Sequence, residues 1–398
     1  MEGAMSSGTK VKYPGLREGS WFSQFLYGSN PWMARYVYGL MFLVTNFLAW
    51  AVRDYGQSAM KEMHRLEGCR NVADCLGTKG VLRVSLGCFM FFFAMFLSTV
   101  GTTKVDDCRD IWNSGWWSAK ALMFIGFMAL PFLLPSSLIY LYGEIAHFGA
   151  GVFLLIQLVS VINFVMWLND CCLSEKNGER CRLHVMLTSI ASYILTIVGI
   201  ILMYIWYAPD PSCLLNIFFI TWTLVLLQLM TSISIHPSIN AGFLAPGLMG
   251  LYLAFLCWCA IRSEPSGTFC NRKAEASTRT DWLTIISLVI ALLTIVIATF
   301  STGIDSQCFQ FCRPKKQAEN GVPYGYGFFH FVFATGAMYF AMLLIGWNTH
   351  HPMKKWTIDV GWTSTWVRIV NQWLAACVYI WMLVAPVILK ERQTGELP

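Results

Sequence analysis

The chain has 398 residues, of which 56% are hydrophobic, 15% aromatic and only 13% charged. A soluble protein of this length could not bury so much apolar surface, so lipid must solvate much of the chain. The net charge of +6 is spread over short polar segments, and no basic run with interleaved aromatic residues occurs, which argues against a nucleic-acid partner. The composition predicts an all-α, polytopic membrane protein.

Ten apolar segments alternate with polar ones and predict ten membrane-spanning helices. Residues 1–31 are predicted to form a flexible cytoplasmic tail, and residues 32–398 the transmembrane domain. In chain order, the predicted spans are 32–52, 81–100, 117–134, 136–169, 183–207, 214–232, 243–261, 282–300, 324–347 and 366–389. Pro131 and Pro135 block the continuation of the third helix, so the chain must turn there into the fourth.

The fourth segment, 136–169, is unusually long and contains no proline. A straight helix of this length would extend about 51 Å, against about 30 Å of bilayer hydrocarbon, so we expect it to cross with a steep tilt. Its polar residues form one face in the first half and a different face in the second half. They are Ser137, Tyr140, Glu144 and His147, then Gln157, Ser160 and Asn163. We therefore expect different neighbours at its two ends; the alternative is an ordinary long span with a wet start.

Ten spans place both termini on the same side of the membrane. Lys and Arg are slightly more numerous in the segments on this side than in those on the other side, where they are concentrated in longer loops that count less toward orientation. This side is therefore predicted to be cytoplasmic. Four cysteines then fall on the exterior, and an oxidising exterior favours two disulfides. They are Cys69, Cys75, Cys213 and Cys270. Cys69 and Cys75 are the easiest pair to close, but the sequence leaves the pairing open.

Several segments resemble the serine incorporator family of membrane proteins. They are VPYGYGFFHFVFATGAMYFAMLLIGW (322–347), WTSTWVRIVNQWLAACVYIWMLVAPVIL (362–389), KGVLRVSLGCFMFFF (79–93), FLLIQLVSVINFVMWLND (153–170) and HPSINAG (236–242). The resemblance runs from about residue 32 to the C-terminus and is strongest to the plant branch. One departure is that many members begin with a cysteine-rich apolar segment, whereas this chain has no cysteine before Cys69.

The resemblance implies ten helices in two bundles, joined and crossed by the long tilted helix at 136–169. It also implies action on serine-derived lipids, phosphatidylserine and sphingolipids, in the endomembrane system (ER/Golgi) or the plasma membrane. We expect a phospholipid scramblase that is not driven by ATP. The alternatives are a serine carrier and a scaffold that supports lipid-synthesis enzymes; a homo-oligomer is left open.

A lipid-headgroup groove is the predicted site. A carboxylate within a span is costly unless it is paired or faces water, so Glu144 and His147 are expected to line a polar groove, with Arg83 or Lys120 as counter-ion. The alternative is a structural ion pair that locks the bundles together. His236 and Asn240 lie where a helix breaks, and exposed backbone groups there could bind ions or headgroups. A simple re-entrant turn is the alternative.

The sequence offers little support for an enzyme. It contains no HExxH, GxSxG or Walker sequence and no cluster at metal-ligand spacing, so we expect no catalytic residues, metal or cofactor. Cys308 and Cys312 have no nearby histidine to complete a metal site. His330 is expected to be a hydrogen-bonded packing residue, and Asn371 and Gln372 to bond across helices.

Overall fold

The computed structural model describes residues 31–62, 77–104, 107–173, 178–265, 270, 297, 299–300, 322–349 and 358–395. Within these residues every regular element is a helix. The helices are α2 (Pro31–Glu62), α4 (Thr78–Thr99), α5 (Cys108–Ser114), α6 (Trp117–Leu133), α7 (Ser136–Leu173), α8 (Gly178–Tyr207), α9 (Leu214–Ile235), α10 (Leu244–Arg262), α13 (Tyr326–Ile345) and α14 (Trp362–Gly395).

Eight of these helices are long and apolar enough to cross a membrane: α2, α4, α7, α8, α9, α10, α13 and α14. The pair α5 and α6, bent by 68° at its break, brings the number to nine if it counts as one span. The predicted tail at 1–31, except for its last residue, and nearly all of the predicted span at 282–300 lie outside the described residues. The chain is thus an all-α polytopic membrane protein with eight or nine candidate spans in its described part.

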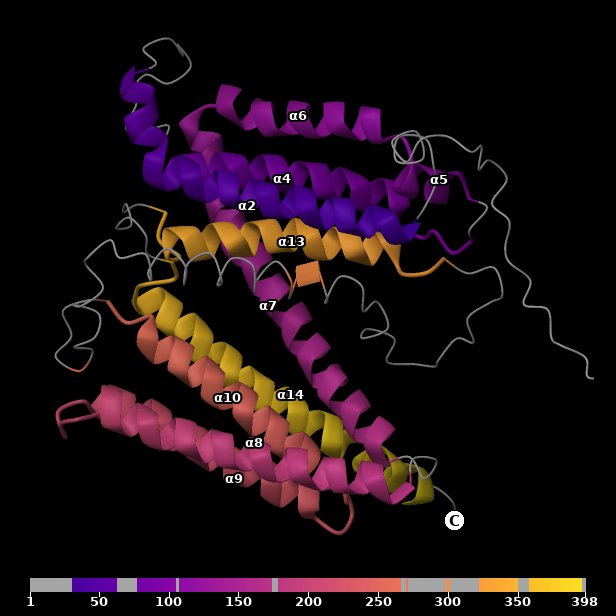
Figure 1. Ribbon diagram of the computed structural model, residues 1–398, viewed down its shortest axis with the longest axis vertical. Coiled ribbons are helices and arrows are strands. Elements are labelled where there is room, and N and C mark those ends of the chain that lie inside the picture. Colours follow the sequence, from indigo (N-terminus) through magenta and orange to yellow (C-terminus); the bar gives the residue numbers. More distant parts are fainter. Residues whose placement is uncertain are drawn as a thin grey trace, which may run out of the picture.

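The helices form two bundles (Figure 1). The first contains α2, α4, α5, α6 and α13, and its core is largely aromatic, with Phe91 and Phe92 of α4 against Phe329 and Phe333 of α13. The second contains α8, α9, α10 and α14, and its core includes Met249, Leu253 and Tyr379. Helix α13 is apolar all round and 89% of its span is buried, whereas only 22% of the α8 span is, so α13 is central and α8 peripheral.

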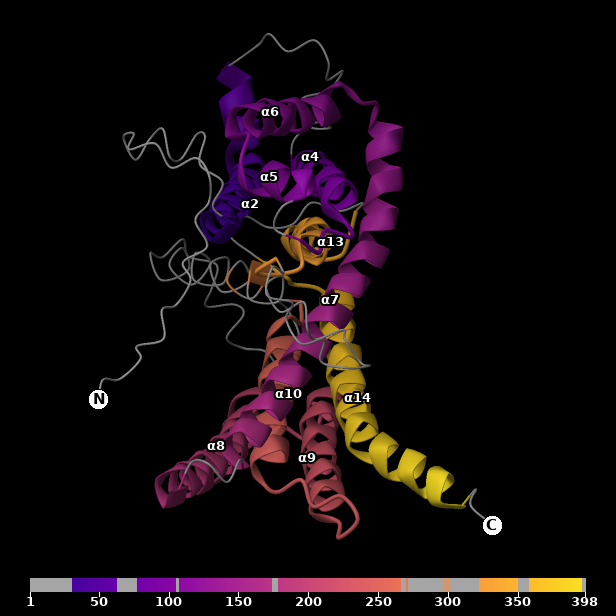
Figure 2. The same ribbon diagram turned by 90° about the vertical axis from the view of Figure 1, so that its right-hand side faces the viewer.

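Helix α7 crosses from one bundle to the other, as Figure 2 shows from the side. Its first half contributes Ile139, Ala146 and Phe153 to a core shared with α4 and α13. Its second half contributes Leu158 and Ile162 to the core shared with α9, α10 and α14. The prediction that this helix meets different neighbours at its two ends is confirmed.

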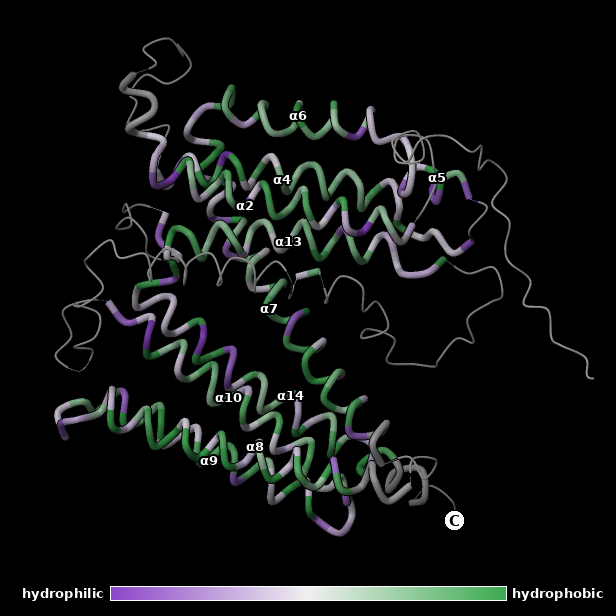
Figure 3. The backbone as a smooth tube through the Cα atoms, viewed as in Figure 1, coloured by the Kyte–Doolittle hydropathy of each residue, from purple (hydrophilic) through white to green (hydrophobic). Residues whose placement is uncertain are grey.

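The helices are largely hydrophobic along their length, with hydrophilic residues at several of their ends and at a few positions inside helices such as α7 (Figure 3). Helix α5 lies in a charged segment between two predicted spans and begins after Asp107, whose carboxylate accepts a hydrogen bond from the Arg109 backbone N–H at 3.3 Å. Such N-caps stabilise the first turn of a helix.

Helix α6 ends at Leu133, as expected from the prolines near its end.

Candidate functional site

Glu144 lies on the exposed side of α7. Its neighbours on that face are the exposed apolar residues Leu141, Ile145 and Phe148, with 57%, 51% and 77% of their surfaces accessible. The Glu144 carboxylate makes no hydrogen bond or ion pair with any residue that the structure describes. It lies about 12 Å along the helix from the start of α7, on a face whose other exposed residues are apolar. A charge in that position is costly unless water or polar headgroups reach it.

His147, one turn further along α7, points toward the end of α13. Its Nδ1 lies 2.8 Å from the Gly143 carbonyl oxygen, and its Nε2 lies 3.2 Å from the carbonyl oxygen of Trp347. Gly346 and Trp347 both adopt left-handed backbone conformations where α13 ends. His147 therefore joins α7 to the α13 terminus, while Glu144 on the same helix is exposed.

Arg83 is buried, with 2% of its surface accessible, and binds the end of α6. Its Nη1 donates to the Leu134 carbonyl at 2.9 Å and also to the Pro131 carbonyl. Pro135 has no N–H to donate to the Pro131 carbonyl four residues before it, and that carbonyl accepts instead from the Leu134 N–H at 3.3 Å and from Arg83. Among the described residues the structure does not pair Arg83 with Glu144 as expected, because its Nη1 is bonded to these carbonyl groups instead.

Lys120 is also engaged elsewhere. Its Nζ donates to the Asn113 carbonyl at 2.8 Å and lies 4.3 Å from the centre of the Trp117 ring. The side chain is fully buried near the start of α6. That position is about 20 Å along α6 from its junction with α7, so among the described residues the structure does not pair Lys120 with Glu144 either.

His236 and Asn240 lie in the exposed turn between α9 and α10. The Asn240 N–H donates to the His236 carbonyl at 2.9 Å, and the Ser238 N–H donates to His236 Nδ1 at 3.3 Å. His236 and Asn240 thus lie in a hydrogen-bonded turn that joins the two helices. The turn is at the far end of the second bundle, whereas Glu144 lies on the half of α7 that packs on the first (Figure 1). The structure does not bring these residues together with Glu144.

A buried polar cluster in the first bundle could not be predicted from the sequence. The Asn113 carbonyl accepts from the Tyr38 hydroxyl at 2.8 Å, and its side-chain oxygen lies 2.9 Å from His330 Nε2. The Tyr326 hydroxyl donates to Asp110 at 2.6 Å. These bonds tie α2, α5 and α13 together, and they confirm His330 as a hydrogen-bonded packing residue. Its partners are about 217 residues away in the chain, so no local pattern indicates them.

The bundles are also joined by an ion pair that the sequence pattern does not indicate. Asp359, in the connection between α13 and α14, pairs with Arg368 of α14. The Asp359 N–H donates to the Leu343 carbonyl of α13 at 2.9 Å. Nearby, Gln372 donates to the Thr223 hydroxyl at 2.7 Å and to the Leu253 carbonyl at 3.0 Å, which confirms its predicted cross-helix role.

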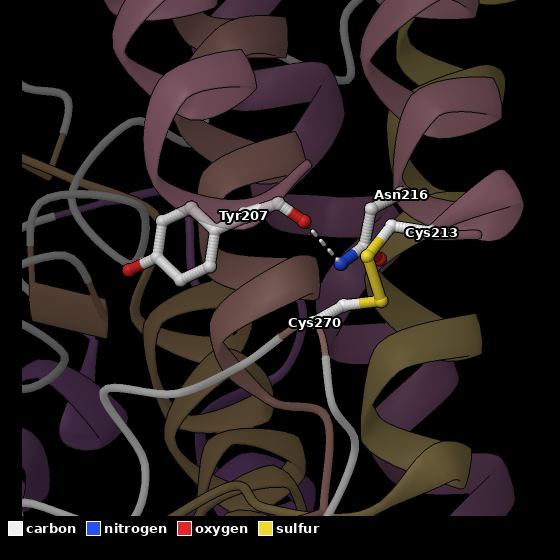
Figure 4. The surroundings of a disulfide bond; sticks show 4 residues. All are labelled: Tyr207, Cys213, Asn216 and Cys270. Atoms are coloured by element: carbon white, nitrogen blue, oxygen red, sulfur yellow. Dashed lines mark hydrogen bonds between the residues drawn. A yellow bond between two sulfur atoms is a disulfide. The ribbon is translucent and has the colours of Figure 1, made fainter. Parts of the chain in front are cut away.

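A disulfide joins Cys213 to Cys270, with 5.8 Å between their Cα atoms (Figure 4). It links the turn between α8 and α9 to the segment that follows α10. Next to it, the Asn216 side-chain amide donates to the Tyr207 carbonyl at 3.0 Å. Two of the four cysteines predicted to be exterior thus form one bond; Cys69 and Cys75 lie outside the described residues.

The chain matches the family described as Serine incorporator (Serinc) over residues 19–313 and 310–392. It is 25% identical over 382 residues to a probable serine incorporator of Nematostella vectensis, with 83% of this chain and 82% of the relative covered. It is 26% identical to serine incorporator 3 of Bos taurus, with 79% of each chain covered. It is also 26% identical to a probable serine incorporator of Dictyostelium discoideum, with 90% of this chain and 94% of the relative covered. This match covers nearly all of the two bundles and the helix between them: the chain belongs to the serine incorporator family.

Proposed function

We propose that this protein is a passive phospholipid scramblase, with phosphatidylserine among its substrates, and that the exposed face of α7 around Glu144 guides headgroups across the membrane. One observation carries the proposal: a carboxylate without a partner among the described residues lies exposed between Leu141, Ile145 and Phe148. Such a group is stable in a span only if it draws water or polar headgroups to itself.

The mechanism follows from the cost of moving a headgroup through hydrocarbon. A fixed carboxylate and the water around it stabilise the ammonium group of a passing headgroup, which lowers the barrier to its passage. The acyl chains remain in lipid and pack against the apolar residues on the same face of α7. No step requires ATP or an ion gradient, so lipid moves in whichever direction its own gradient dictates.

The purified protein reconstituted into vesicles tests this function. Vesicles carry NBD-labelled phosphatidylserine or phosphatidylcholine, and dithionite quenches the label in the outer leaflet only. We expect quenching well beyond half of the label with protein and half without it. Quenching that stops at half for both lipids would contradict scrambling. Saturable serine uptake would then indicate a serine carrier, and co-purification with phosphatidylserine- or sphingolipid-synthesising enzymes would indicate a scaffold.

A further inference from the structure

A small cavity lies beside the Cys213–Cys270 disulfide, apart from the exposed face of α7. Its volume is about 100 Å³, and its walls come from the start of α9, the segment after α10 and the first residue of α14. Glu264, Asn216 and Trp362 line it together with the two cysteines. Figure 4 shows Asn216 next to the disulfide that forms part of the wall.

The cavity contains acceptor oxygens without donors. Glu264 and Asn216 are only 3% and 2% exposed. Neither Glu264 Oε1 nor Asn216 Oδ1 has a hydrogen-bond partner among the residues that the structure describes. The amide nitrogen of Asn216 donates to the Tyr207 carbonyl and also interacts with the Glu264 carboxylate, so the side chain cannot turn to satisfy Oδ1 without losing these contacts. A buried acceptor without a partner is destabilising, and more so when it is charged, so this site favours a positively charged occupant.

The donor set and the volume define that occupant. A water molecule takes about 30 Å³, so the cavity has room for one small ion and one or two waters. Carboxylate and amide oxygens suit hard cations, and one carboxylate balances one positive charge. A divalent ion such as Ca²⁺ takes about 6–8 oxygen ligands, often from several carboxylates, which this cavity does not offer. We propose that the cavity binds a small monovalent cation, Na⁺ or K⁺, through Glu264 and Asn216.

A proton competes with the cation for the Glu264 carboxylate. Burial raises the pKa of Glu264 to about 7, and the Asn216 side chain offsets part of that rise. The charged groups near this end of the bundle have other partners or face water. Arg262 lies over the Trp258 ring, Asp359 pairs with Arg368, and Asp210 is exposed. Cation binding is therefore expected to be strong above neutral pH and weak below it.

Thermal unfolding of the purified full-length protein in detergent tests the site. Unfolding is followed by tryptophan fluorescence at pH 8.5, in 150 mM NaCl, KCl or N-methyl-D-glucamine chloride, the last being too large to enter. We expect a midpoint ~2 °C or more higher in NaCl or KCl, because a ligand that binds the folded state stabilises it. The difference should shrink at pH 5.5. Glu264→Gln should abolish it, whereas Asp210→Asn, which removes an exposed charge at the same end of the bundle, should keep it.

Equal midpoints in the three salts at pH 8.5 would overturn the proposal. A salt difference retained by Glu264→Gln would overturn it too, as would stabilisation by sub-millimolar CaCl₂ that NaCl does not reproduce. If the Glu264→Gln protein fails to fold, the test rests on the wild-type unfolding midpoints in the three salts at pH 8.5 and 5.5. A difference between the salts that does not weaken at pH 5.5 would contradict a cation site at Glu264.

Discussion

Arg83 and Glu144 occupy opposite electrostatic situations within the same part of the fold. The Arg83 guanidinium is buried and hydrogen-bonded to carbonyl groups, whereas the Glu144 carboxylate is exposed on an apolar face. The hydrogen bonds of Arg83 stabilise the junction between α6 and α7, whereas Glu144 contributes little to the stability of the fold. A charged side chain within a span is thus no sign of function by itself, because its partners decide its role.

Replacing Arg83 by methionine should destabilise the protein by roughly 2 kcal/mol, because the buried Pro131 carbonyl and the half-buried Leu134 carbonyl lose a charged donor. Arg109 offers a matched control, since it also donates to a carbonyl, that of Val100 at 2.7 Å, but is exposed. Water replaces the lost donor in Arg109→Met, so its unfolding midpoint should stay close to wild type. Equal losses in the two variants, measured by thermal unfolding in detergent, would contradict this account of Arg83.

Glu264 should make stability depend on pH. Its pKa rises on folding from an ordinary value of 4.5 to about 7, so the folded state binds the proton more tightly than the unfolded state. The stabilisation is fully present below pH 4.5 and is lost as the pH rises through 7. In N-methyl-D-glucamine chloride, the wild-type midpoint should therefore fall between pH 5 and 8 relative to that of Glu264→Gln. Parallel profiles for the two proteins would show that Glu264 titrates normally.

At the scale of helices, α4 and α6 approach closely at Gly87. A Cβ atom placed there would lie 2.7 Å from the Phe127 carbonyl oxygen and 2.9 Å from the Met128 Cα, both part of the α6 backbone. Gly87→Ala should force α6 away and destabilise the protein by about 1–3 kcal/mol, as overpacking usually does. Gly126→Ala is the control, because nothing lies within 4 Å of its added atom. A neutral Gly87→Ala in the same thermal assay would show that the α4–α6 contact is loose.

Hydropathy predicts most of the helices but not all of their ends. Helix α14 begins at Trp362, four residues before the expected position, because its first turn contains Ser364 and Thr365, which reduce the hydropathy. Both are fully buried, and Thr365 donates to the Gly361 carbonyl at 3.2 Å. Helix α5 is too short and charged to show a spanning pattern. The two polar faces of α7, in contrast, predicted its change of neighbours because that property depends only on local spacing.

At the scale of the whole molecule, partners distant in the sequence were beyond prediction. Arg83 was placed in the predicted groove because its span enters the membrane from the same side as that of Glu144. The missing N–H of Pro135 was a signal for its real role, since it removes the usual helical donor of the Pro131 carbonyl, which accepts from the Leu134 N–H and from Arg83. The Asp359–Arg368 pair and the cluster around Asn113 had no such signal, because their geometry depends on how the helices pack. The resemblance to the serine incorporator family predicted two bundles crossed by a long helix, an arrangement that the spacing of residues alone does not predict.

The central claim is that Glu144 guides lipid headgroups along the exposed face of α7. The most direct test compares scrambling of NBD-labelled phosphatidylserine by wild type, Glu144→Gln and Asp210→Asn in the same vesicles. If the lost charge raises the barrier by ~1.4 kcal/mol, scrambling by Glu144→Gln slows about tenfold, while Asp210→Asn keeps the wild-type rate. The unfolding midpoint of Glu144→Gln should not change, because Glu144 makes no bond with the described residues. A wild-type rate for a folded Glu144→Gln protein would contradict the claim.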